Sequence, residues 1–234
     1  MLTINVGANG HKCRVLHLGG QNPRNCYYLN GVELSKTNTC SDLGVTITSD
    51  LSWSEHVACI TRKANRTVYL ITKAFGKANV KVIVALYKTY IRPILEFANS
   101  VWSPHLVRDN DLLEATQRRV TRLPFGQIRP SYQDRLKLMC LPMLSRRRKR
   151  GDAITVFRAL TDGDSPIRYL FPLNTDGRTR GHAFKLLKEK FRTDVRKYFI
   201  TNRVFEFWNS LPAHVVSCKN LTEFKIRLDL HQRD

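Results

Sequence analysis

The sequence is poor in acidic residues. Its 234 residues include 19 Asp and Glu against 39 Lys and Arg, which gives a formal net charge of +20. Such an excess raises the local concentration of polyanions, so it favours nucleic acid or an anionic membrane surface as a partner. Because the basic residues are clustered along the chain, we expect a nucleic-acid partner rather than a merely solvated basic surface.

Long apolar runs are also missing. The longest, Val82–Leu86, is far too short to cross a bilayer. The first residues, Met1–Asn5, show neither the basic start nor the apolar stretch of a signal peptide. We therefore expect no membrane partner.

The six cysteines include no Cys-x-x-Cys pair, and a chain of this length does not need disulfides to form a core. This usage predicts a reduced, intracellular setting. His11, Cys13 and His17 lie close together, but their spacing matches no common zinc signature, so we expect no metal site.

Groups that could perform catalysis are not apparent. Polymerases hold two metal ions on carboxylates that meet at one point, and the sequence has no Asp-Asp pair on a turn between strands. No nucleophile elbow and no P-loop is present. Asp50, Asp109, Asp111 and Asp152 stand at expected helix or turn starts, where capping explains them. The chain alone is therefore expected to be inactive as an enzyme and to hold no cofactor.

The first fifty residues have the pattern of short strands. Alternating apolar residues predict strands at 14–18 and 43–48, and Asn30-Gly31 predicts a tight hairpin turn. Gly44 falls inside the second of these strands, where it indicates a bulge or the close approach of another backbone.

A long amphipathic helix is predicted after Trp53. Ser52-x-x-Glu55 has the pattern of a capping box, and Gly76 marks the end. The apolar stripe consists of Val57, Ile60, Ala64, Val68, Ile71 and Phe75. Arg62, Arg66 and Lys73 fall on the opposite face. Such a ridge can follow the phosphate backbone of a duplex without reading its sequence.

The rest of the chain is predicted to be mainly helical. We expect helices at 79–102 with a kink before Pro93, and at 109–123, 131–139, 152–160, 182–199 and 202–211, with a last one opened by Asn220. The expected fold class is α+β, with a small N-terminal antiparallel strand region followed by a helical part. The expected domains are 1–50, 51–160 and 182–234, with 161–181 as a linker rich in Asp, Gly and Pro.

A second basic cluster lies between Arg118 and Arg150. It holds eleven Lys or Arg and one acid, Asp134. Guanidinium groups match phosphate geometry, so this cluster predicts nucleic-acid contact, and a solvated helix face is the alternative. The candidate contacts are Arg118, Arg119, Arg122, Arg146, Arg147, Arg148, Lys149 and Arg150. The run 146–150 is also a candidate nuclear-import tract. Trp53, Trp102 and Trp208 could stack on bases, but lone aromatics beside apolar runs are expected in the core.

Several short motifs occur in an order typical of one family. Asn9–Gly19 resembles the segment called motif D, with Lys12 at its lysine position. Leu43-Gly44-Val45 resembles a primer grip, 51–75 resembles the start of a thumb domain, and Trp208–Pro212 resembles a later motif. Together they resemble the part of a non-LTR (LINE-type, CR1/jockey-like) retrotransposon reverse transcriptase that follows its catalytic carboxylates.

The resemblance implies a function for the chain. The parent protein of such a mobile element would be an RNA-directed DNA polymerase using Mg²⁺, with its carboxylates upstream of Lys12 and outside this truncated chain. The chain itself would contribute binding of the RNA/DNA template–primer duplex. Two alternatives stay open, a non-catalytic nucleic-acid-binding protein recruited by a host and a basic module that binds acidic protein.

Overall fold

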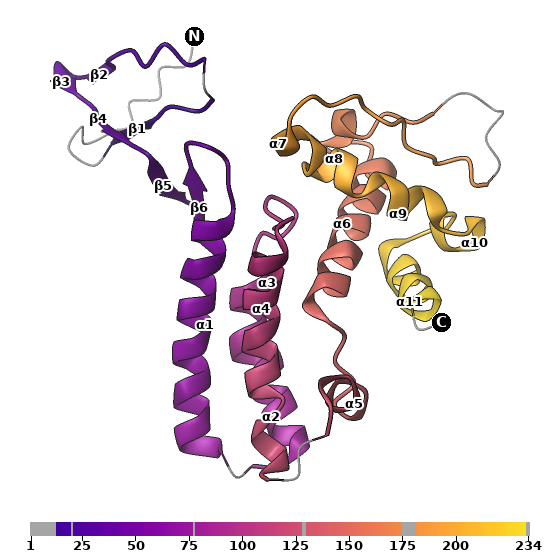
Figure 1. The fold of residues 1–234 in the computed structure, drawn as a ribbon. Coiled ribbons are helices and arrows are strands. Elements are labelled where there is room, and N and C mark those ends of the chain that lie inside the picture. Colours follow the sequence, from indigo (N-terminus) through magenta and orange to yellow (C-terminus); the bar gives the residue numbers. More distant parts are fainter. Residues whose placement is uncertain (1–12, 20, 77, 128–129, 175–180, 233–234) are drawn as a thin grey trace. The chain divides into compact units, whose positions relative to one another are not determined.

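The computed structural model describes residues 13–19, 21–76, 78–127, 130–174 and 181–232. Short strands near the N-terminus precede a series of helices, so the predicted α+β class is confirmed (Figure 1). The chain divides into two compact units, one ending at Cys59 and the other beginning at Ile60. This boundary falls inside the first helix, α1 (Ser54–Phe75).

The N-terminal unit contains three two-stranded sheets within its described residues. Two are antiparallel, β2 (Tyr28–Leu29) with β3 (Val32–Glu33) and β5 (Thr39–Asp42) with β6 (Val45–Thr48). The third pairs β1 (Arg14–Leu16) with β4 (Ser35–Thr37) in parallel, so the prediction of a purely antiparallel region was wrong. A parallel pair needs a long crossover, which the segment between β1 and β4 supplies.

Both antiparallel hairpins turn through two residues in the left-handed region. Asn30 and Gly31 have φ values of 52° and 78°, which confirms the predicted turn. Leu43 and Gly44 have φ values of 45° and 83° and join β5 to β6 in the same way. Gly44 therefore lies in a turn and not inside a strand, so the predicted bulge was wrong, and the strand begins at Val45.

Helix α1 (Ser54–Phe75) matches the predicted amphipathic helix. It ends before Gly76, as expected. A Cβ atom at Gly76 would lie 2.5 Å from the carbonyl oxygen of Thr72, so the chain can leave the helix this closely only with glycine.

The predicted helix at 79–102 is shorter and more irregular than expected. It consists of α2 (Val80–Leu86), the π-turn η2 (Tyr87–Ile91) and α3 (Arg92–Glu96). The π-turn lies just before Pro93, which has no N–H to continue the helical ladder, at the place where the sequence predicts a kink. The extension to Trp102 was wrong, because the chain turns at Ala98 with a φ of 54°.

The middle of the chain follows the prediction except at one boundary. Helix α4 spans Val107–Val120, the turn η3 spans Leu123–Phe125, and α5 spans Tyr132–Leu138 with Ser131 as its cap. Helix α6 spans Leu144–Thr161. It begins eight residues before the predicted start at Asp152, so the basic run 146–150 lies within its first turns.

The C-terminal helices are short. They are η4 (Arg168–Leu170), α7 (Asp194–Lys197), α8 (Ile200–Arg203), α9 (Phe205–Ser210), α10 (Ala213–Val216) and α11 (Leu221–His231). The predicted helix at 182–199 was wrong over most of its length. The Asn209 side chain accepts from the Leu186 amide at 2.9 Å and donates to the Leu186 carbonyl at 3.1 Å, which fixes this backbone in a non-helical course.

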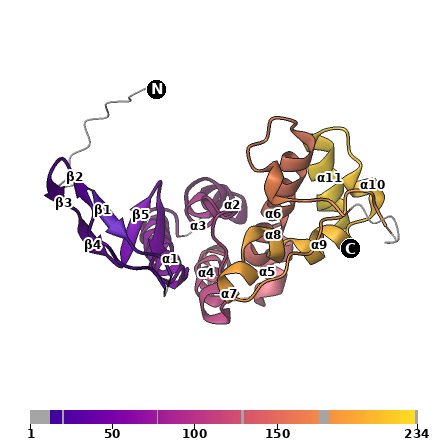
Figure 2. The ribbon, with the colours of Figure 1, turned by 90° about the horizontal axis from the view of Figure 1, so that it is seen from above.

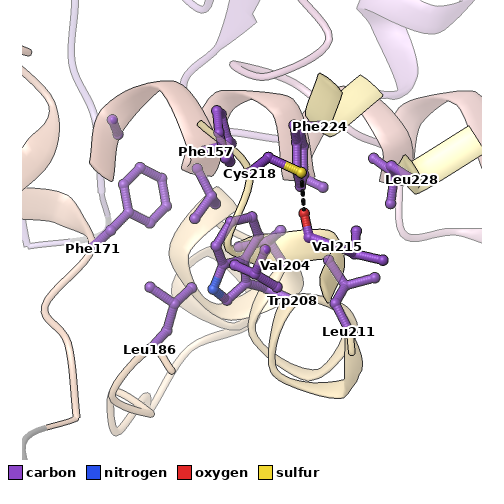
Figure 3. Packing of buried hydrophobic residues seen from close by; sticks show 14 of the residues in the cluster. Phe157, Phe171, Leu186, Val204, Trp208, Leu211, Val215, Cys218, Phe224 and Leu228 are labelled. Atoms are coloured by element: carbon purple, nitrogen blue, oxygen red, sulfur yellow. Dashed lines mark hydrogen bonds between the residues drawn. The ribbon is translucent and has the colours of Figure 1, made fainter. Parts of the chain in front are cut away.

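A hydrophobic core joins α6 to the helices after it. Helices α6 and α11 lie side by side (Figure 2). Phe157 of α6 stacks on Phe224 of α11 with ring centroids 4.3 Å apart, and Trp208 lies beside them with its side chain fully buried (Figure 3). Phe171, within the predicted linker, belongs to the same cluster. The core therefore includes residues from both sides of the segment 161–181, and Trp102 and Trp208 are core residues as expected.

A buried ion pair connects three segments within this unit. Arg203 of α8 forms a two-pronged contact with Asp152 of α6, with both nitrogen–oxygen distances 2.8 Å. Its side chain is 11% exposed, and that of Asp152 is 6% exposed. The same guanidinium donates to the carbonyl oxygens of Asn99 and Ser100, at 3.1 and 2.9 Å. One arginine thus fixes the turn after α3 onto α6 and α8.

Replacing Arg203 is expected to be strongly destabilising. Arg203→Met leaves the Asp152 carboxylate buried without its partner, so the free energy of unfolding should fall by about 3 kcal/mol or more. Chemical denaturation measures this loss. The double variant Arg203→Met/Asp152→Leu should recover part of it, because no lone charge remains. A single variant within about 0.5 kcal/mol of the original protein, the range for ordinary surface changes, would contradict this role.

Candidate nucleic-acid interface

The exposed face of α1 carries three of the predicted contact residues. Arg62, Arg66 and Lys73 are all exposed, whereas Ala64 and Val68 are buried on the other side. Spacings of four and seven residues keep the three cations on one face. They extend over about 16 Å, because each helical residue advances the axis by about 1.5 Å. The geometry is a straight row of cations on a continuous helix.

Tyr69 on this face and Lys63 beside it were missed by the sequence analysis. Tyr69, which is 57% exposed, lies between Arg66 and Lys73 along the helix, and the Lys73 Nζ lies 5.0 Å from the centre of its ring. Lys63 is exposed beside Arg62. The same helical period that selected Arg62, Arg66 and Lys73 could have identified Tyr69. We define the α1 ridge as Arg62, Arg66, Tyr69 and Lys73.

The arginines at the end of α4 differ in their freedom. Arg119 and Arg122 are exposed. Arg118 is half-buried, and its guanidinium lies 5.1 Å from the centre of the Tyr132 ring. Tyr132 in turn donates to the buried carboxylate of Glu114 at 2.7 Å. Arg119 and Arg122 can therefore reach a phosphate group, while Arg118 already packs against its own protein.

Three arginines of the run 146–150 make contacts within the protein. Arg147 forms a two-pronged contact with Glu96, with one nitrogen–oxygen distance of 2.8 Å. Arg150 does the same with Asp229, at 2.9 Å for one pair of atoms. Arg148 is buried and donates to Asn110. These side chains connect α6 to α3, α4 and α11, so their guanidinium groups are already occupied.

Burial and pairing change the proton affinity of two of these groups. The hydrogen bond to Glu96 raises the pKa of Arg147, so its charge is held firmly. Burial lowers the pKa of Arg148, because water no longer solvates its charged form. Of the remaining two members of the run, Lys149 is exposed and Arg146 is half-buried. Within the run 146–150, three arginines therefore hold the fold together, and Lys149 and Arg146 remain more accessible.

The primer-grip-like residues form the tip of the β5–β6 hairpin. Leu43 is 87% exposed at the turn, whereas Val45 is buried at the start of β6. The backbone N–H of Thr46 donates to Nδ1 of His56 at 3.1 Å, which ties the hairpin to the first turn of α1 within the N-terminal unit. An exposed Leu beside Gly44 offers an apolar contact point at this tip.

No metal site is found in the described residues, where no group of three or more His, Cys, Asp or Glu could hold an ion. Lys12, the motif D-like position, and His11 lie outside the described residues. None of the helices in that part of the chain has the length and apolar character needed to cross a membrane.

The chain is similar to a protein of a nematode. An uncharacterized protein of Caenorhabditis elegans is 26% identical over 102 residues, which cover 42% of this chain and 52% of the relative. The chain thus spans about half the length of that relative. No protein-family model matches the chain, and no solved structure matches it significantly.

A matched pair of exchanges tests the structural role of Arg147. Arg147→Lys keeps the charge but loses the two-pronged contact with Glu96, so the free energy of unfolding should fall by about 1 kcal/mol. Lys149→Arg, two residues along the same helix, should change it by less than about 0.5 kcal/mol. Denaturant titration compares the two. Equal stabilities for both variants would show that Arg147 does not support the fold.

The His56 contact predicts a pH dependence of the N-terminal unit. Burial lowers the pKa of His56 below 6.5, and its Nδ1 can accept from Thr46 only when the ring is neutral. At pH values between the lowered pKa and 6.5, the unfolded chain binds more protons at His56 than the folded chain does. The stability that His56 contributes to the N-terminal unit is therefore fully present above pH 6.5 and decreases as the pH falls toward the lowered pKa. The hydrogen-exchange protection of the Thr46 amide should fall by up to about fivefold from pH 6.5 to 5.5.

The control for this prediction is His56→Gln. Its amide oxygen can accept the same hydrogen bond but does not titrate, so its Thr46 protection should not respond to pH. If the two proteins lose protection equally on acidification, His56 is not the group responsible.

Proposed function

We propose that this chain is the post-catalytic part of a non-LTR retrotransposon reverse transcriptase and that it holds the RNA/DNA template–primer duplex. The observation that carries this proposal is the α1 ridge, whose cations form a straight row on the face opposite the buried stripe. The sequence resemblance, which extends over most of the chain, supports it independently.

The dimensions of the ridge suit a duplex backbone. Phosphates of one strand advance by about 3.4 Å along the helix axis, so a row of about 16 Å passes several of them. Arginine and lysine side chains reach outward from a rigid helix and contact phosphates without selecting a base sequence. Sequence-independent binding is what a polymerase needs where it grips the product of its own synthesis.

Some of the basic residues suggested by the sequence are excluded as nucleic-acid contacts. Arg147, Arg148 and Arg150 are hydrogen-bonded within the protein and are left out. The proposed contacts are Arg62, Arg66, Lys73, Arg119 and Arg122, with Arg118, Arg146 and Lys149 as secondary candidates. In the parent polymerase, the carboxylates and Mg²⁺ would be supplied by the segment before Lys12, and the Leu43–Val45 tip would lie at the primer.

The decisive experiment removes the charges of the α1 ridge. The triple variant Arg62→Gln/Arg66→Gln/Lys73→Gln should bind a labelled RNA–DNA hybrid more weakly than the original protein, measured by fluorescence anisotropy over a range of salt. The slope of log Kobs against log salt should decrease in magnitude by about 2.7, since each phosphate contact contributes about 0.9.

A variant with the same loss of charge provides the control. Lys81→Gln/Lys88→Gln/Lys219→Gln also removes three exposed cations but leaves the ridge intact. If both triple variants weaken binding equally, the interaction reflects net charge alone and the proposed interface is wrong. Affinity of the original protein that does not change with salt would also reject the proposal.

A further inference from the structure

An extended segment of the C-terminal region combines aromatic and basic side chains. Residues 184–192, which we call the aromatic–basic segment, run without helix before α7 (Figure 1). Its backbone is anchored at one end, where the Leu187 amide donates to the Pro172 carbonyl at 2.8 Å and Leu186 bridges to Leu173. The segment therefore has a defined course on the protein rather than that of a free loop.

Two phenylalanines of this segment are partly covered. Phe184 and Phe191 are each 40% exposed, so more than half of each residue's surface packs against protein. The backbone carbonyl of Phe184 accepts from Nε1 of the buried Trp208 at 2.8 Å, which fixes the backbone at this residue. The exposed part of each phenylalanine offers a surface on which another flat group can stack.

The charges of the segment are predominantly positive. Lys188, Lys190 and Arg192 are exposed. The acid among them, Glu189, is occupied within the protein, because its carboxylate accepts from Arg196 and from the hydroxyl of Thr201 at 3.1 Å. Lys188 lies 4.0 Å from Glu206, but both side chains are largely exposed, so this pair is weak. Phosphate groups near Phe191 would therefore meet cations without a competing free carboxylate from Glu189.

We propose that the aromatic–basic segment binds single-stranded nucleic acid, with bases stacking on Phe184 and Phe191 and phosphates contacting Lys190 and Arg192. A single strand fits because its bases have free faces, and stacking on aromatic side chains together with a basic path is how proteins bind such strands without sequence preference. Bases of a duplex are stacked on one another and offer no such face.

An anionic membrane is the competing partner for basic and apolar side chains, and the geometry argues against it. Insertion into a bilayer requires apolar side chains that project from the surface. Phe184 and Phe191 are instead more than half covered, and Leu187, at 51% exposed, is the one apolar side chain of the segment with more than half of its surface free. The proposed site is also separate from the α1 ridge, so it does not depend on the proposed function.

The test exchanges the ring of Phe191 while keeping an apolar side chain. Phe191→Leu should weaken binding of a fluorescein-labelled 15-nucleotide oligo(U) by about tenfold, within the range for the loss of one stacked base. Phe191→Tyr retains the flat ring and should bind within about twofold of the original protein. Lys190→Gln/Arg192→Gln should reduce the salt slope by about 1.4, at about 0.7 per phosphate of a single strand.

Two parallel measurements make the outcome specific. Phe191→Leu should bind the RNA–DNA hybrid within about twofold of the original protein. The α1 ridge variant should bind the hybrid more weakly, and adding Phe191→Leu to that variant should weaken oligo(U) binding by the same factor as in the original protein. Thermal unfolding followed by circular dichroism verifies that each variant is folded. The two proposals can therefore fail separately.

Three results would overturn the inference. If Phe191→Leu does not change oligo(U) binding, or if Phe191→Tyr weakens it equally, stacking does not contribute. Loss of binding to phosphatidylserine vesicles in Phe191→Leu, without loss of oligo(U) binding, would assign the segment to a membrane surface instead.

Discussion

The contact between Arg203 and Asp152 is the interaction on which the C-terminal unit depends. It brings together α6, α8 and the turn after α3, segments that are about fifty and a hundred residues apart in the chain. The guanidinium also satisfies two backbone carbonyls of that turn, which would otherwise lack these donors. The hydrophobic cluster around Trp208 packs on one side of α6. The ion pair connects the same helix, through Asp152 and Arg203, to the turn at Asn99 and Ser100.

Pairing within the protein decides which basic residues are available to a partner. In the sequence, Arg146–Arg150 is the densest positive run and Arg62, Arg66 and Lys73 are widely spaced. In the structure, the dense run supplies Arg147, Arg148 and Arg150 to contacts with other helices, and the widely spaced residues are exposed. Local charge density is therefore a poor guide to a phosphate-binding surface when acids lie far away in sequence and near in space.

The sequence predicted those elements that depend on local physics. Three predictions that follow from neighbouring residues are confirmed, namely the period of α1, the Asn30-Gly31 turn and the Asn220 cap. The failures involve distant partners. Segment 182–193 is not helical, because the Asn209 side chain forms hydrogen bonds with the backbone N–H and C=O of Leu186. The residues of the segment alone do not predict this distant partner. The partners of the arginines of α6 are likewise set by tertiary packing.

The two-pronged contacts of Arg147 and Arg150 have a consequence for how relatives of this chain should diverge. If the α1 ridge binds phosphates, as proposed, its lysine and arginine residues can replace one another with little loss, because a phosphate accepts hydrogen bonds from both. A carboxylate held by both prongs of a guanidinium cannot be served equally by an ammonium group. Among relatives, we therefore expect Arg-to-Lys exchanges to be frequent in the α1 ridge and rare at Arg147 and Arg150 of α6.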